Sequence, residues 1–225
     1  MTSVTVGVDP AAPRPDIAFR LHVPDDWLTL DLDPATSDAW VEGVLDARIA
    51  EHPQAARHRG HMRRILQGLV EQQRAAGVFL AAVLAAGERP ADLVGGNLAL
   101  TWLELNSPPE SIEWLARFFA EDDPQDGENP DLRGVEVVDL PAGPAVRVHT
   151  TLLAPIPEST RTQRVAVSQL VLPVPGTAWL ATVTVSTPNL ALAETFAQLA
   201  DDIAQSISFP DPDARPTGRI GQLPG

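Results

Sequence analysis

Apolar and polar residues alternate through the C-terminal half of this 225-residue chain, from Val135 to Ser186. A β-strand turns successive side chains to opposite faces of a sheet, so a period of two predicts strands with one buried face. Short segments rich in proline and glycine separate the alternating runs. The sequence therefore predicts two β-hairpins, formed by residues 135–140 with 145–153 and by residues 163–172 with 177–186.

In the N-terminal half, from residue 33 onward, apolar residues recur at helical spacing instead. Asp33 followed by Pro34 predicts a helix start, because a proline at the first helical position loses no hydrogen bond there. The pattern breaks at Pro53 and then resumes, so a long helical insert is expected to reach Ala76. Its second helix is expected to bury one apolar face, made of Met62, Ile65, Leu66, Leu69 and Val70.

Two further helices are expected around the hairpins. The segment Ser107-Pro108-Pro109-Glu110 predicts a capping box, and the helix after it buries a stripe through Leu115 and Phe119. A closing helix is expected to be capped by Thr187, to begin at Pro188 and to end near Ser206. The segment 121–131 is acidic and rich in proline, which is typical of a loop.

Three extended segments complete the expected core. Residues 17–23 predict a first strand, residues 78–85 a strand buried on both faces, and residues 93–105 its partner, with a short extended stretch at 27–32. Proline-rich ends predict flexible tails at 1–16 and 210–225, which leaves a single domain at 17–209. The order of elements predicts an α+β fold in which helices cover a mainly antiparallel β-sheet.

Two stretches resemble the PsbP-like superfamily, which includes Mog-type, DcrB-like and LpqN-like proteins and the Eag chaperones of type VI secretion. They are the opening segment from Phe19 to Trp27, with its proline and tryptophan, and the closing hairpin and helix from Leu172 to Ile203. The resemblance implies an α/β/α sandwich whose members mostly bind other proteins. The helical insert at 34–76 departs from that family's pattern, and no binding residue carries over.

Lysine and cysteine are absent from the sequence. Their absence excludes a Schiff-base lysine, a P-loop lysine, a thiolate nucleophile and a zinc–thiolate site. A net charge of −14 disfavours nucleic acid and anionic membranes as partners. The bias toward arginine and alanine suggests a bacterial source. The sequence has no cysteine and shows no signal-peptide pattern, which predicts a cytoplasmic location. No apolar run is long enough to cross a membrane.

An arginine-rich segment stands out in this acidic chain. Arginine binds carboxylates through two parallel hydrogen bonds, so Arg48, Arg59, Arg63 and Arg64 are candidates for binding an acidic partner or a segment of the protein itself. The plainer interpretation makes them solvated residues paired with Glu51 and Glu71. The neighbouring histidines lack a metal-binding pattern, so no metal and no cofactor are expected.

Two other sets of residues are candidates. Trp114 and Phe118 form a second stripe on their helix. This stripe is either an exposed contact for a partner or part of the buried core. Arg147, His149 and Arg164 belong to a polar strip with Thr151, Ser168, Thr182 and Thr184, which lines either a groove or an ordinary solvent-facing sheet. The expected function is a non-enzymatic binding or adaptor protein. The alternatives are a self-assembling subunit and a hydrolase that uses His149 with a carboxylate.

Overall fold

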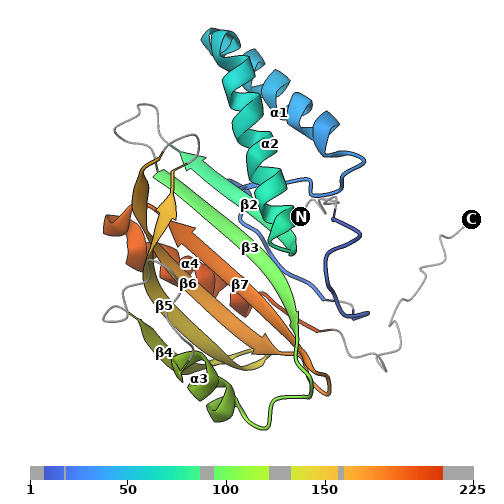
Figure 1. Cartoon of the computed structure of the whole chain (residues 1–225), viewed down its shortest axis with the longest axis vertical. Helices are drawn as coiled ribbons and strands as arrows, with labels where there is room; N and C mark the ends of the chain where they lie inside the picture. The colour runs from blue at the N-terminus through green and yellow to red at the C-terminus, as the bar shows by residue number, and fades with distance from the viewer. Residues whose placement is uncertain (1–7, 18, 87–93, 122–132, 157–159, 210–225) are drawn as a thin grey trace, which may run out of the picture.

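The computed structural model describes residues 8–17, 19–86, 94–121, 133–156 and 160–209. Its centre is one seven-stranded antiparallel sheet in the order β1-β2-β3-β7-β6-β5-β4 (Figure 1). The strands are β1 (Leu28–Thr29), β2 (Val78–Ala86), β3 (Val94–Glu104), β4 (Gly134–Leu140), β5 (Gly143–Pro155), β6 (Thr162–Pro173) and β7 (Trp179–Thr187). The helices are α1 (Ser37–Glu51), α2 (Arg59–Ala75), α3 (Ile112–Glu121) and α4 (Ala193–Gln205), with short 3₁₀ turns η1 (Pro53–His58) and η4 (Leu190–Leu192).

Both predicted hairpins are present. β4 pairs with β5 and β6 pairs with β7, and β5 also pairs with β6, so the two hairpins form one continuous meander. The predicted partners β2 and β3 form a third hairpin. Because β3 then pairs with β7, the N-terminal and C-terminal halves share one sheet. The expected antiparallel α+β fold is confirmed.

Helices cover both faces of the sheet. On one face α4 buries Phe196, Ala200 and Ile203 in the largest apolar cluster, together with side chains such as Leu100 and Val183. On the opposite face α3 buries Leu115 over β5, β6 and β7. The α1–α2 hairpin packs on that same face at its other end, over β2 and β3. The arrangement is an α/β/α sandwich, and among the described residues α3 and the α1–α2 hairpin cover the two ends of the face opposite α4.

The helical insert follows the short strand β1, as expected, and is anchored at one end. Val70 of α2 packs with Leu30 and Leu32, which follow β1, while the far end of the hairpin projects beyond the sheet (Figure 1). Gly77 ends the helical region with a φ of 67°, a left-handed conformation that favours glycine. Ile65, expected to be buried, is 42% exposed because it lies on the projecting part.

The predicted first strand at 17–23 is wrong. Among its described residues, 17 and 19–23, the backbone makes one bridge, between Arg20 and Ser208, and the short β1 pairs with β2 instead. The alternation in this segment reflects burial without sheet pairing, because Ile17, Phe19, Leu21 and Val23 pack against the α4 side of the core. Part of the expected N-terminal tail, residues 8–16, is described, and there Ala12 and Pro15 are buried.

Helix starts were predicted too early in three places. Asp33 accepts the backbone N–H of Ala35 at 2.8 Å, but α1 itself begins at Ser37. The expected capping box at residues 107–110 lies outside α3, where Ser111 instead accepts the N–H of Trp114 at 3.1 Å. In both places proline residues extend the chain before the helix begins. Thr187 accepts the N–H of Asn189, but the turn η4 precedes α4.

Gly96 lets α4 approach the sheet closely. A Cβ atom at this position would lie 2.2 Å from Cε1 of Phe196, whose ring also packs beside Trp27. At neighbouring Gly95 the nearest atom to a Cβ would be in Pro188, at 3.9 Å. A glycine within a strand often marks a close approach of another element, and the helix α4 makes that approach at Gly96.

The substitution Gly96→Ala is expected to lower the free energy of unfolding by about 1–3 kcal/mol, because the added Cβ forces the buried Phe196 ring of α4 to shift away from the sheet. Gly95→Ala is the matched control, since its Cβ meets only ordinary contacts, and it is expected to be neutral or slightly stabilising. Chemical denaturation of both variants measures the difference. Equal stability of the two variants would contradict this packing.

Candidate functional site

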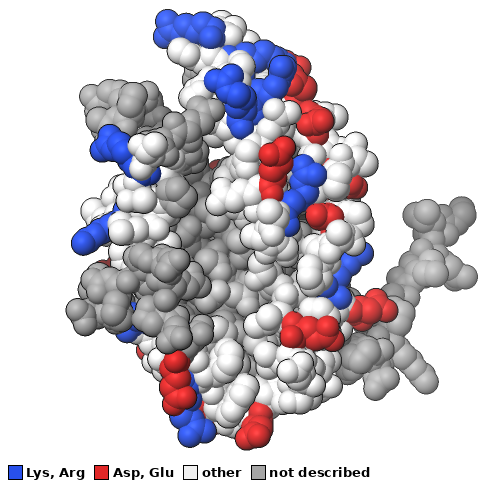
Figure 2. Space-filling model, viewed as in Figure 1, with Lys and Arg blue, Asp and Glu red and all other residues white. Residues whose placement is uncertain are grey.

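Two of the candidate arginines bind the protein's own α1 helix. Arg59 of α2 donates to Glu42 and to Asp46, each at 2.6 Å, and Arg63 also contacts Glu42 at 2.6 Å. Hydrogen bonds from Arg63 and then Arg59 lower the pKa of Glu42, so this carboxylate stays ionised between the two guanidinium groups. The ion pairs join α1 to α2 along the part of the hairpin that projects from the sheet. Figure 2 shows the charged side chains gathered there.

Arg48 and Arg64 lie on the exposed surface of the same hairpin. Arg48 is 3.9 Å from Glu51, the one expected acidic partner that the structure confirms among the interactions described. Long exposed pairs of this kind contribute little to stability. The predicted basic surface is therefore partly used within the protein, because Arg59 and Arg63 already bind the carboxylates of Glu42 and Asp46.

Arg147 fastens the sheet to α4. Its guanidinium donates two hydrogen bonds to Asp201 of α4, through Nε at 3.0 Å and through Nη2, and Nη1 donates to Glu136 of β4 at 2.9 Å. Burial opposes the charged form, but hydrogen bonds to Asp201 and Glu136 more than offset it, so the pKa of Arg147 is raised. Each of the three guanidinium nitrogens donates a hydrogen bond within the protein. Arg147 thus holds the fold together and does not line an open groove.

His149 lines a hollow between the sheet and the start of α4. The cavity has a volume of about 370 Å³ and is also lined by Ser168, which lies directly opposite His149 in the β5–β6 register. Desolvation and the nearby Arg147 lower the pKa of His149, although Glu136, 3.9 Å from Nε2, acts in the opposite direction. The imidazole is therefore held mainly in its neutral form.

Ser168 is poorly placed to be a nucleophile. Its side chain is 4% exposed, and its hydroxyl has less than 1 Å² of accessible area and no hydrogen-bond partner among the described residues. A serine nucleophile needs both a base within hydrogen-bond reach and an open path to the substrate. Ser168, His149 and Glu136 are brought together, but they do not form a hydrogen-bonded chain that could pass a proton.

The predicted polar strip is split between the two faces of the sheet. Residues 147, 149, 151, 164 and 168 face the α4 side, whereas Thr182 and Thr184 face the α3 side. The register decides this, because Thr184 pairs with Gln169 while Ser168 pairs with Val185. The expectation of one groove lined by all these residues is wrong, and Arg164 lies exposed near the start of β6.

Trp114 and Phe118 form a stacked pair on α3. Their ring centroids are 5.7 Å apart at an angle of 22°, and Phe118 is 45% exposed while Trp114 is half-buried. Figure 1 shows α3 lying across β4, the last strand at one edge of the sheet. Val137 of β4, on the same face as the α3-contacting Val135, is 43% exposed. We call Trp114, Phe118 and Val137, with the outer edge of the last strand β4, the α3–β4 surface.

The two elements of the α3–β4 surface carry more exposed acidic than basic side chains among the described residues. Glu113 and Glu121 of α3 and Asp139 of β4 are exposed, as is Arg117. A hydrogen bond from its own backbone N–H and one from Ser111 lower the pKa of Glu113, so it is ionised at neutral pH. Sequence reasoning identified the two aromatic residues but missed Val137, because only the sheet order shows that β4 is an edge strand.

Known proteins provide one distant structural match. No protein-family model matches the sequence, and neither does any curated protein sequence. Among solved structures, the chain is similar to LpqN of Mycobacterium tuberculosis, described as involved in cell envelope biogenesis, with 13% identity and a TM-score of 0.43. The match covers 89% of this chain and 85% of LpqN. At this identity and TM-score the match assigns no family to the chain and identifies no functional residue.

The lowered pKa of His149 predicts how stability changes with pH. The folded-state pKa of His149 lies below the unfolded value of about 6.5, so below about pH 6.5 the unfolded chain binds more protons at this residue than the folded one. The free energy of unfolding is therefore highest above about pH 6.5 and decreases as the pH falls below it. His149→Gln is expected to flatten this part of the profile, and Glu136→Gln to steepen it, since Glu136 favours the imidazolium. Thermal unfolding measured between about pH 7 and 5.5 checks the sign. A steeper profile for His149→Gln would contradict it.

Proposed function

We propose that this chain is a non-enzymatic binding protein whose α3–β4 surface docks a partner protein. The observation that carries the proposal is the stacked pair of Trp114 and Phe118, which leaves Phe118 45% exposed beside a sheet edge. Tryptophan and other large aromatic residues are enriched among the residues that dominate binding energy in protein interfaces. Here the stacking on Trp114 fixes the Phe118 ring, so little side-chain entropy is lost on binding.

The edge of β4 adds a second mode of contact. An edge strand has backbone N–H and C=O groups without strand partners on one side, and partner proteins use such edges by adding a strand. β4 is seven residues long and is the outermost strand of the sheet next to β5. A partner that pairs with β4 would also reach the exposed Val137. The acidic rim favours a partner segment with basic residues around an apolar anchor.

The arginine-rich hairpin fits this role less well than the sequence suggested. Arg59 and Arg63 already bind Glu42 and Asp46, and an acidic partner would have to displace those carboxylates. The hydrolase alternative rests on His149, which lines a cavity and lies 3.9 Å from Glu136; it gains no nucleophile from Ser168, whose hydroxyl is buried. Self-association stays a second candidate, because the β4 edge of one copy can pair with the β4 edge of another.

A photo-crosslinking amino acid tests this proposal in the native organism. With p-benzoylphenylalanine in place of Phe118, ultraviolet light is expected to link the chain to one main partner. The same substitution at Ile65 is the control, because that residue is comparably exposed, at 42%, but lies on the α2 helix. Adding Asp139→Arg is expected to lower the yield at position 118 severalfold, by repelling basic residues of the partner.

The mass of the crosslinked product separates the two candidates. A single product containing another protein supports partner binding, whereas a product of two copies of this chain supports self-association. No discrete product from position 118, or the same products from positions 65 and 118, would overturn the assignment of this surface.

A further inference from the structure

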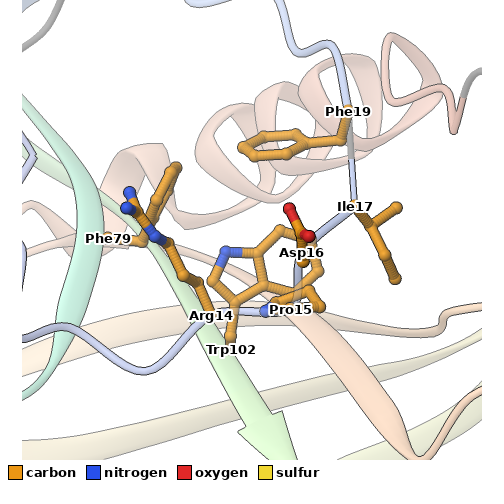
Figure 3. Close-up of a pocket in the computed structure, with 7 residues that line it drawn as sticks. All are labelled: Arg14, Pro15, Asp16, Ile17, Phe19, Phe79 and Trp102. Carbon is orange, nitrogen blue, oxygen red and sulfur yellow. The ribbon is translucent and has the colours of Figure 1, made fainter.

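A second cavity lies away from the α3–β4 surface, where the N-terminal segment crosses the sheet. It has a volume of about 430 Å³, within the range typical of small-molecule sites. Arg14, Pro15, Asp16, Ile17 and Phe19 of the N-terminal segment form one side, and Phe79 of β2 and Trp102 of β3 form the other (Figure 3). No residue of the proposed docking surface takes part.

Aromatic rings make the walls of this cavity rigid. Phe19 meets Trp102 edge-on with centroids 5.1 Å apart, and it meets Phe79 in the same way at 5.5 Å. Phe79 lies where the β2–β3 register shifts, between Val78 and Leu80, and such bulges redirect a side chain. The bulge therefore supplies the third ring of the cluster. Edge-on contacts of this kind hold the rings in place before any ligand binds.

Trp102 presents a hydrogen-bond donor that nothing in the described part of the chain satisfies. Its side chain is 5% exposed, and its Nε1–H group is buried without a partner among those residues. Native proteins rarely leave a buried donor without an acceptor, because the N–H group then loses its hydrogen bonds to water and gains none in return. The indole lines the cavity, but its Nε1 atom has less than 1 Å² of accessible area, so a ligand supplies the missing acceptor only by displacing a neighbouring side chain.

The charges on the wall favour a negatively charged acceptor beside Trp102. The Arg14 guanidinium lies over the Phe79 ring, 5.9 Å from its centroid. Figure 3 shows the nitrogen-bearing edge of the Trp102 indole on the same side as Arg14, and the Asp16 carboxylate over the other side of the indole. Asp16 therefore opposes an anion, but from the side away from the unsatisfied donor. The rings between these groups suit an apolar body.

We propose that this cavity binds a small carboxylate with an aromatic or similarly apolar body. Its carboxylate accepts the Trp102 Nε1–H hydrogen bond and pairs with Arg14, and its apolar body packs against Phe19 and Phe79. The N-terminal segment contributes both Arg14 and Phe19, so it forms part of the site. The aromatic rings and Asp16 by themselves would favour a cation. The proposed ligand is an anion instead.

Three compounds with one carbon skeleton test the charge of the ligand. The probes are 3-phenylpropionate, 3-phenylpropan-1-ol and 3-phenylpropylamine, titrated into the full chain labelled with ¹⁵N. Each of the five tryptophans gives one indole N–H signal, and Trp102→Phe identifies the signal of Trp102 by its loss. We expect 3-phenylpropionate to shift that signal downfield, as a new hydrogen bond forms, and to bind more tightly than the alcohol or the amine.

Single substitutions test the contacts. Trp102→Phe is expected to weaken 3-phenylpropionate about tenfold or more, as loss of a hydrogen bond to a charged group does. Trp40→Phe, on α1 at the opposite face, is the control and is expected to leave binding unchanged. Arg14→Gln is expected to weaken the carboxylate, and Asp16→Asn to strengthen it by about two- to fivefold.

Two results would overturn the site. One is an unmoved Trp102 signal at saturating 3-phenylpropionate, and the other is tighter binding of the amine together with its weakening in Asp16→Asn. The second result would show a cation site instead. Because Phe118 is not involved, both results are independent of the crosslinking experiment.

Discussion

The pairing of β3 with β7 is the constraint on which the rest of the structure depends. These strands align from Asn97 with Ser186 to Glu104 with Trp179, and they join two hairpin systems that are far apart in the sequence. Each hairpin can form locally, but neither has a complete core alone. The cost of closing this long loop is offset by burial on both faces of the joined sheet. The surface on which α4 packs is complete only when β3, which carries Gly96, has paired with β7.

Local patterns in the sequence predicted most elements because their periods are local. The alternation between residues 135 and 186 predicted both C-terminal hairpins, and the cap at Thr187 with Pro188 predicted the final helix, although too early a start. The order of strands could not be predicted, since no short-range pattern specifies that β7 pairs with β3. For the same reason the alternation at 17–23 was interpreted as a strand, although it records only which side chains are buried.

The candidate site was predictable in its residues but not in its contacts. Trp114 and Phe118 lie four residues apart, so their stacking on one helix face follows from helical geometry. The partners of Arg59 and Arg147 are distant in sequence, and a solvated arginine cannot be distinguished from a clamped one by composition. Their carboxylates, Glu42 and Asp201, were therefore missed. In a chain of net charge −14, the structure uses its best-placed arginines to connect its own elements.

Native-state hydrogen exchange tests the central role of the β3–β7 pairing most directly. If the two halves form one cooperative unit, the amides that bond β3 to β7 exchange only through global unfolding, as slowly as those between β5 and β6. Gly96→Ala should then lower the protection of both sets together. Faster exchange between β3 and β7 than between β5 and β6, with separate responses to that substitution, would show two independent halves and contradict the account.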